Sequence, residues 1–210
     1  MTQKAISELQ QQIYELTVQL NTLRKTAPRV AVRDYTFATQ TGAVTLGDLF
    51  AGRERLLLIH NMGQGCRYCT LWADGFNGLV DHLESAMAVV LVSNDCPDLQ
   101  REFANSRGWR FRLASHGGGE YMVEQSVLEG AGNMPGAVVY ERDGDGDGDG
   151  DGDGDAIYRK SACVFGPGDQ YCTMWSLLGL AGMGEDEWTP QFRYWRQPAQ
   201  LDDGGENVQS

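Results

Sequence analysis

The chain has 210 residues, 41% of them hydrophobic and 22% charged, which is a globular composition at a length that suits one domain with additions. Its net charge is −12, but seven negative charges belong to the aspartates of one Asp-Gly run at 143–155, which leaves −5 for the rest. The absence of a basic stripe and of a ~20-residue apolar stretch argues against nucleic acid and membrane as partners. The polar N-terminus does not resemble a signal peptide, so we expect a cytoplasmic protein.

Residues 1–27 are predicted to form an amphipathic helix that ends before Pro28. Short isolated helices are marginal in water, so its apolar stripe needs a partner. We expect the stripe to pack either on the chain's own domain or against a second copy in a homodimer. Six apolar residues follow one another in steps of three and four and so share this stripe: Ile6, Leu9, Ile13, Leu16, Leu20 and Leu23.

Residues 28–197 alternate between strand and helix patterns, as a single α/β domain does. The early strand–helix–strand order implies parallel pairing, and the last two strands form an antiparallel hairpin, so we predict a mixed sheet with helices on both faces. Strands are predicted at 30–37, 55–60, 87–92, 109–115, 137–140 and 156–164. Helices are predicted at 45–50, 66–83, 97–107 and 171–180.

The Asp-Gly run at 143–155 is predicted to be a disordered acidic loop, and residues 198–210 a disordered tail. Aspartate oxygens suit calcium, but the run has neither the apolar residue of calcium-binding β-helix repeats nor the spacing of a helix–loop–helix site. We therefore expect no calcium there.

Cys66 and Cys69 form a C-x-x-C motif between a predicted interior strand and an amphipathic helix. At a helix N-terminus, unpaired N–H groups and the helix dipole stabilise an anion, which favours a thiolate at Cys66. Cys69 lies one turn further on the same side, where it can close a disulfide or resolve a mixed disulfide at Cys66. We predict Cys66 as the attacking thiol and Cys69 as the resolving thiol.

Other roles fit these cysteines less well. A haem attachment site needs His where this chain has Thr70, and a zinc site needs a second ligand pair. Cys163 and Cys172 are separated by eight residues and do not form one, so we expect neither metal nor cofactor. Cys96 is predicted to be a bystander, and a Cys163–Cys172 bond would require suitable packing of strand and helix.

The cysteine motif belongs to a longer block, and the block resembles a bacterial family of thioredoxin-like proteins predicted to be dithiol–disulfide oxidoreductases. The resemblance spans about residues 5 to 195. It implies a thioredoxin-like three-layer sandwich, with a mixed central sheet flanked by helices and an extra N-terminal helix and strand. The residues that carry it are His60-Asn61-Met62-Gly63, Ala73-Asp74-Gly75-Phe76-Asn77-Gly78, His82-Leu83, Asp34-Tyr35-x-Phe37, Leu46-x-Asp48-Leu49-Phe50, Gly108-Trp109-x-Phe111 and Ser115-His116-Gly117.

The resemblance also implies a substrate-binding role for Met134 and Pro135. Thioredoxin-like folds carry a cis-proline that faces the dithiol, and Pro135 stands directly before a predicted strand. We expect a cis bond there and a Met134 backbone that can pair with an extended substrate; the alternative is an ordinary trans proline. The family usually has Pro and Ser where this chain has Arg67 and Tyr68, so thiol acidity and redox potential do not carry over.

Three other residues admit a functional and a structural interpretation. His60 could bias the thiolate electrostatically, but a hydrogen-bonded core histidine is the preferred interpretation. Trp72 is expected to be core rather than a substrate platform, and His116 a loop residue.

The first functional hypothesis is a cofactor-free thiol–disulfide oxidoreductase acting on a disulfide-bearing protein or a small thiol. The second is a peroxiredoxin-like thiol peroxidase, in which Cys66 attacks peroxide and Cys69 resolves the sulfenic acid. Against it, Ile59 and Gly63 stand where peroxiredoxins have Pro and Thr. The third is a redox-inactive thioredoxin-like scaffold for dimerisation or partner binding.

Overall fold

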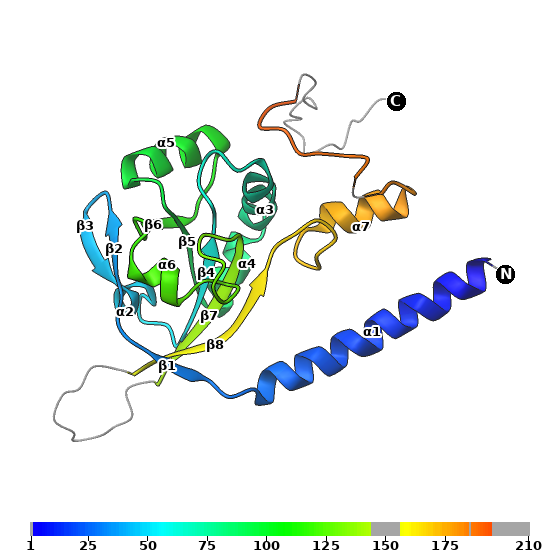
Figure 1. Ribbon diagram of the computed structural model, residues 1–210, viewed down its shortest axis with the longest axis horizontal. Helices are drawn as coiled ribbons and strands as arrows, with labels where there is room; N and C mark the ends of the chain where they lie inside the picture. Colours follow the sequence, from blue (N-terminus) through cyan, green and yellow to red (C-terminus); the bar gives the residue numbers. More distant parts are fainter. Residues whose placement is uncertain (1, 144–155, 185, 195–210) are drawn as a thin grey trace.

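An eight-stranded mixed sheet forms the centre of the protein (Figure 1). The computed structural model describes residues 2–143, 156–184 and 186–194. The strands are β1 (Val30–Val32), β2 (Thr36–Thr39), β3 (Gly42–Thr45), β4 (Arg55–His60), β5 (Ala88–Ser93), β6 (Arg112–Ser115), β7 (Gly136–Arg142) and β8 (Ile157–Val164). The helices are α1 (Thr2–Thr26), α2 (Leu46–Leu49), α3 (Arg67–Asn77), α4 (Val80–Ala86), α5 (Pro97–Arg107), α6 (Glu120–Glu124) and α7 (Thr173–Leu180).

The strand order β1-β8-β7-β4-β5-β6-β2-β3 places the most apolar strands in the middle. β4 pairs in parallel with β5, and β5 in parallel with β6, through the crossover helices that the sequence predicts. β7 runs antiparallel to β4, and β8 antiparallel to β7. The α/β class, the mixed sheet and the closing hairpin are therefore confirmed.

Two apolar cores cover the two faces of the sheet. One is built around the aromatic side chains of Tyr35, Phe37, Phe50 and Tyr140, with α2 and the β2–β3 hairpin packed against it. The other lies under α3, α4, α5 and α7 and contains Trp72, Trp109, Phe165 and Trp175. Both β4 and β5 contribute side chains to both cores, which is why their sequences are almost continuously apolar.

Two predicted elements are each divided in the structure, and two observed elements were not predicted. The strand expected at 30–37 is two strands, because residues 33–35 connect β1, at one edge of the sheet, to β2, which lies between β6 and β3. The helix expected at 66–83 breaks into α3 and α4 at Gly78, and Leu79 is exposed as a result. The strand β3 and the short helix α6 were not predicted.

The N-terminal helix is confirmed, but its expected packing on the chain's own domain is wrong. None of the 25 residues of α1 is buried, and Figure 1 shows the helix extending away from the sheet. Its C-terminal end is anchored to the described part of the domain. Arg24 donates a hydrogen bond to the Tyr171 hydroxyl at 2.8 Å, and the Lys160 ammonium donates to the Lys25 carbonyl at 3.2 Å and to the carbonyl of Ala27, the residue after the helix, at 2.6 Å.

The predictions of disorder for the Asp-Gly run and for residues 198–210 lie outside the described residues, apart from Asp143. In the part of the chain that the structure describes, no helix is both long and apolar enough to cross a membrane.

Candidate active site

The Cys66–Cys69 pair lies where the central strand β4 gives way to helix α3. The two residues form a disulfide, with their Cα atoms 5.2 Å apart, a separation within the normal range for disulfides. Cys66 is the N-cap of α3, and Cys69 lies in the first turn. The predicted placement of the dithiol at a helix N-terminus after an interior strand is therefore confirmed.

A tight loop connects β4 to this helix and fixes the position of Cys66. The Asn61 side chain accepts a hydrogen bond from the Gly63 amide at 2.8 Å, and the Asp95 carboxylate accepts one from the Gln64 amide at 2.7 Å. Gly63 has φ of +114°, and a Cβ there would come within 3.0 Å of the Asp95 carboxylate, so only glycine fits this turn. The Cys66 amide then donates to the Gly63 carbonyl at 3.0 Å.

The two sulfur atoms have different surroundings. Cys66 is partly exposed, whereas Cys69 is only 3% exposed. The Cys66 sulfur accepts a hydrogen bond from the Cys69 backbone N–H at 3.1 Å. After reduction, the same N–H group and the N-terminus of α3 favour negative charge on this sulfur. The geometry thus offers one accessible, charge-stabilised sulfur and one that only its neighbour can reach.

Of the two residues between the cysteines, Arg67 contacts the C-terminal segment 186–194 directly, and Tyr68 is linked to it through Trp175 of α7. The exposed Arg67 guanidinium donates to the Gln191 side chain at 3.3 Å. Tyr68 stacks on Trp175 with ring centroids 6.2 Å apart, and Trp175 packs edge-on against Trp188 at 6.0 Å. No local pattern predicts this contact, because the segment lies more than 100 residues from the cysteines.

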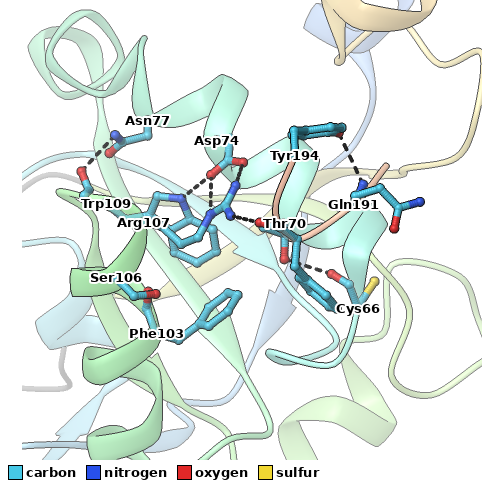
Figure 2. A network of polar contacts seen from close by, with 12 residues as sticks. Cys66, Thr70, Asp74, Asn77, Phe103, Ser106, Arg107, Trp109, Gln191 and Tyr194 are labelled. Carbon is cyan, nitrogen blue, oxygen red and sulfur yellow. Dashed lines mark hydrogen bonds and ion pairs between the residues drawn. The ribbon is translucent and has the colours of Figure 1, made fainter. Parts of the chain in front are cut away.

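Figure 2 shows how the rest of α3 is held. Asp74 accepts hydrogen bonds from the Arg107 guanidinium, with which it forms an ion pair, and from the Trp109 indole at 2.7 Å. Arg107 also donates to the Phe192 carbonyl at 2.6 Å. One turn further, the Asn77 side chain accepts from the Arg110 amide at 2.7 Å. Asp74 and Asn77, both part of the block that carries the family resemblance, therefore dock α3 against the connection between α5 and β6.

His60 is a core histidine, as preferred from the sequence. Its Nε2 atom lies 2.7 Å from the Tyr121 hydroxyl, and the side chain is 2% exposed. Burial lowers the pKa of His60 to about 3, so the ring is neutral near pH 7 and cannot favour a thiolate by positive charge. His116 follows β6 in a loop, as expected, but it is buried, and burial lowers its pKa to about 4.

The Tyr121 hydroxyl belongs to a buried polar chain that was not predicted. It accepts a hydrogen bond from the Tyr140 hydroxyl at 3.2 Å. The Tyr140 hydroxyl oxygen also lies 3.2 Å from Gln125 Oε1. The Gln125 amide donates to the Tyr35 hydroxyl at 3.1 Å, and that hydroxyl donates to Glu124 at 2.7 Å. Together with His60, these groups come from four distant segments, so no local pattern could have predicted this network.

Met134 and Pro135 lie at the same end of the sheet as the dithiol loop. Gly136 pairs with His60, and the Asn133 side chain donates to the Met62 carbonyl at 3.4 Å. The predicted cis-proline is wrong: no peptide bond between described residues is cis, and Pro135 is a buried trans proline whose carbonyl accepts from the Phe165 amide at 2.9 Å. The Met134 amide is also engaged, with the Gly132 carbonyl at 2.9 Å.

The remaining cysteines are free thiols. Cys96 is exposed, Cys163 is partly buried and Cys172 is buried, so no Cys163–Cys172 bond exists. Burial raises the pKa of both Cys163 and Cys172, which makes them weak nucleophiles. Trp72 is 3% exposed, which confirms it as a core residue. Among the described residues, no group of three or more His, Cys, Asp or Glu side chains could hold a metal ion.

Comparison with known proteins supports the fold. Residues 3–200 match a family described as "Bacterial protein of unknown function (DUF899)", and a search of curated proteins finds no match. Reduced Prx3 from Vibrio vulnificus is similar in structure, with 14% identity, a TM-score of 0.51, and coverage of 74% of this chain and 98% of that chain. This similarity confirms the thioredoxin-like fold.

Two other solved structures show weaker similarity. Peroxidoxin BcpB from Mycobacterium tuberculosis has 22% identity and a TM-score of 0.47, with coverage of 54% of this chain and 77% of that chain. A peroxiredoxin-like protein from Aquifex aeolicus has 18% identity and a TM-score of 0.46, with coverage of 65% and 74%.

Proposed function

Because the chain belongs to the DUF899 family of bacterial proteins, whose function is unknown, we propose its function from its own site. The fold and the Cys66–Cys69 disulfide support a role in thiol redox chemistry. The specific proposal is a thiol–disulfide oxidoreductase. The observation that carries it is the partly exposed Cys66 sulfur at the N-cap of α3, bonded to the Cys69 N–H group, with Cys69 buried beside it.

In the reduced protein, the Cys66 thiolate attacks one sulfur of a substrate disulfide. A bond forms between Cys66 and that sulfur, the substrate disulfide breaks, and its other sulfur leaves as a thiolate that takes up a proton. Cys69 then loses its proton and attacks Cys66, which restores the intramolecular disulfide and releases the second substrate thiol. Two electrons pass from the protein to the substrate, and a cellular dithiol must return them.

We assign substrate contact to the segment around Met134 and Pro135, because it borders the loop that carries the dithiol. Because Pro135 is trans and the Met134 N–H is already hydrogen-bonded to the Gly132 carbonyl, the substrate would have to contact other groups of this segment. We propose that the protein acts in the cytoplasm; its three further cysteines are free thiols, which supports a reducing compartment.

The test compares Cys66→Ser, Cys69→Ser and Cys96→Ser. Cys96 provides a matched control, because it is also a helix N-cap and is exposed, but its side chain makes no capping hydrogen bond. We expect Cys69→Ser to accumulate a mixed disulfide at Cys66, Cys66→Ser to form none there, and Cys96→Ser to reduce disulfides like the wild type. Alkylation of Cys66 should have a pH midpoint below about 7.5.

The alternatives give other results in the same assays. A thiol peroxidase would consume peroxide and form a sulfenic acid at Cys66 in Cys69→Ser. A redox-inactive scaffold would show an alkylation midpoint near the free value of about 8.5 and no mixed disulfide. Either result would refute the oxidoreductase proposal.

A further inference from the structure

The apolar stripe of α1 is left uncovered by the part of the chain that the structure describes. Among the described residues of this helix, the exposed fraction of each stripe residue is between 37% and 66%. A contiguous exposed apolar surface of this kind marks an interaction site, and a helix without tertiary contacts is marginally stable in water. We propose that the stripe pairs with the same stripe of a second copy in a parallel two-stranded coiled coil.

The residue types along the stripe favour this partner. With Ile6 at position a of a heptad, the a positions hold Ile6, Ile13 and Leu20, and the d positions hold Leu9, Leu16 and Leu23. β-Branched residues at a combined with Leu at d favour parallel pairs of helices over larger assemblies. The stripe therefore has the composition of a two-stranded seam.

The charges on α1 fit self-association as well. The flanking e and g positions hold Gln, Thr, Ala and, in the last turn, Arg24, so no carboxylate borders the seam. Glu8 and Glu15 lie at the outer c positions, and Lys4 and Lys25 at the outer f positions. Two copies can thus approach along α1 without like-charge contacts between acidic side chains, although each chain carries a net charge of −12.

The first experiment measures the mass of the full-length protein by sedimentation velocity at roughly 1 to 100 μM, the range in which short coiled coils dissociate. Ile13→Asn with Leu16→Asn removes one a and one d residue. Tyr14→Asn with Val18→Asn is the matched control, since both residues are exposed on the same helix but lie off the seam. We expect a wild-type dimer, an unchanged control, and a dissociation constant at least about 100-fold higher for the seam variant.

A second experiment tests the orientation. In a background with Cys66, Cys69 and Cys96 replaced by Ser, Leu9→Cys should form a disulfide-linked dimer on oxidation, because equivalent d residues face each other in a parallel coil. A monomeric wild type, or equal weakening by the seam and control variants, would overturn the proposal. Cross-linking of Leu9→Cys only to a Leu20→Cys copy would overturn the parallel pairing.

Discussion

Cys66 and Cys69 show how position decides reactivity at the scale of single residues. Only two residues separate them, yet one helical turn carries Cys69 into the core while Cys66 stays accessible at the cap. Cys163 and Cys172 have the same functional group, but burial raises the pKa of each thiol and no redox partner lies beside it. Burial therefore distinguishes the accessible sulfur of Cys66 from the weakly nucleophilic thiols of Cys163 and Cys172.

His60 should make stability depend on pH. Burial lowers its pKa from 6.5 to about 3, so between these values the unfolded chain binds a proton that the folded chain does not. The contribution of the neutral His60 ring to the free energy of unfolding is therefore fully present above pH 6.5 and is lost as the pH is lowered toward 3. The buried His116, with its pKa lowered to about 4, acts in the same direction.

Replacing His60 by Asn should remove this one contribution. We expect the slope of the unfolding free energy against pH to become shallower by about 1 kcal/mol per pH unit between pH 5 and 6, because one proton is no longer taken up on unfolding. Urea titrations at several pH values measure the slope. His82→Asn is the control, since His82 is exposed and should leave the slope unchanged. Equal slopes for His60→Asn and the wild type would contradict the assigned pKa.

At the scale of elements, α3 depends on contacts made far from the cysteines it carries. Asp74 joins it to Arg107 and Trp109, and Arg107 also holds the C-terminal segment through the Phe192 carbonyl. Because Arg67, at the start of the same helix, contacts Gln191, the C-terminal segment touches α3 at its beginning and is tied to its middle through Arg107. The helix, the α5–β6 connection and this segment thus form one unit behind the dithiol.

The Asp74→Asn substitution should lower the free energy of unfolding by about 2 kcal/mol, because it leaves a half-buried guanidinium without its carboxylate. Asp81→Asn is a matched control: Asp81 pairs with Arg110 across the neighbouring surface, but its side chain is 73% exposed. We expect that change to stay within about 0.5 kcal/mol. Urea denaturation distinguishes the two, and equal losses would show that the Asp74 pair contributes no more than a surface ion pair.

At the scale of the whole molecule, chain connectivity requires the sheet to curl. β1 and β2 are six strand positions apart in the sheet, yet only residues 33–35 join them. A flat sheet would separate them by about 29 Å at ~4.8 Å per strand, whereas four Cα–Cα steps span at most about 15 Å. The sheet therefore bends until its two sides approach, and Tyr35 in the connection enters the core between them.

Removal of residues 1–21 should leave the α/β domain folded. No residue of α1 is buried, and its bonds to Tyr171 and Lys160 come from residues 24–27, which the deletion keeps. We expect cooperative thermal unfolding with a midpoint within about 5 °C of the wild type, and unchanged alkylation of Cys66. Calorimetry and alkylation kinetics measure both. Loss of cooperative unfolding would mean that α1 directly stabilises the α/β domain of its own chain.

Sequence patterns were enough to predict the class of fold, the positions of the central strands, the N-terminal helix and the placement of Cys66 and Cys69. Each of these follows from local information: hydrophobic periodicity, cap residues and the spacing of the cysteines along one helix. The β4 strand and the α5 helix agree with their predicted bounds for this reason.

Which side chains meet across the fold could be learned only from the three-dimensional structure. The trans geometry of Pro135, the Asp74–Arg107 pair, the Tyr121 network, the division of residues 30–37 and the exposure of α1 all depend on contacts between segments distant in sequence. Such contacts leave no periodic pattern, because the free energy that selects them comes from the completed packing of the sheet and its two cores.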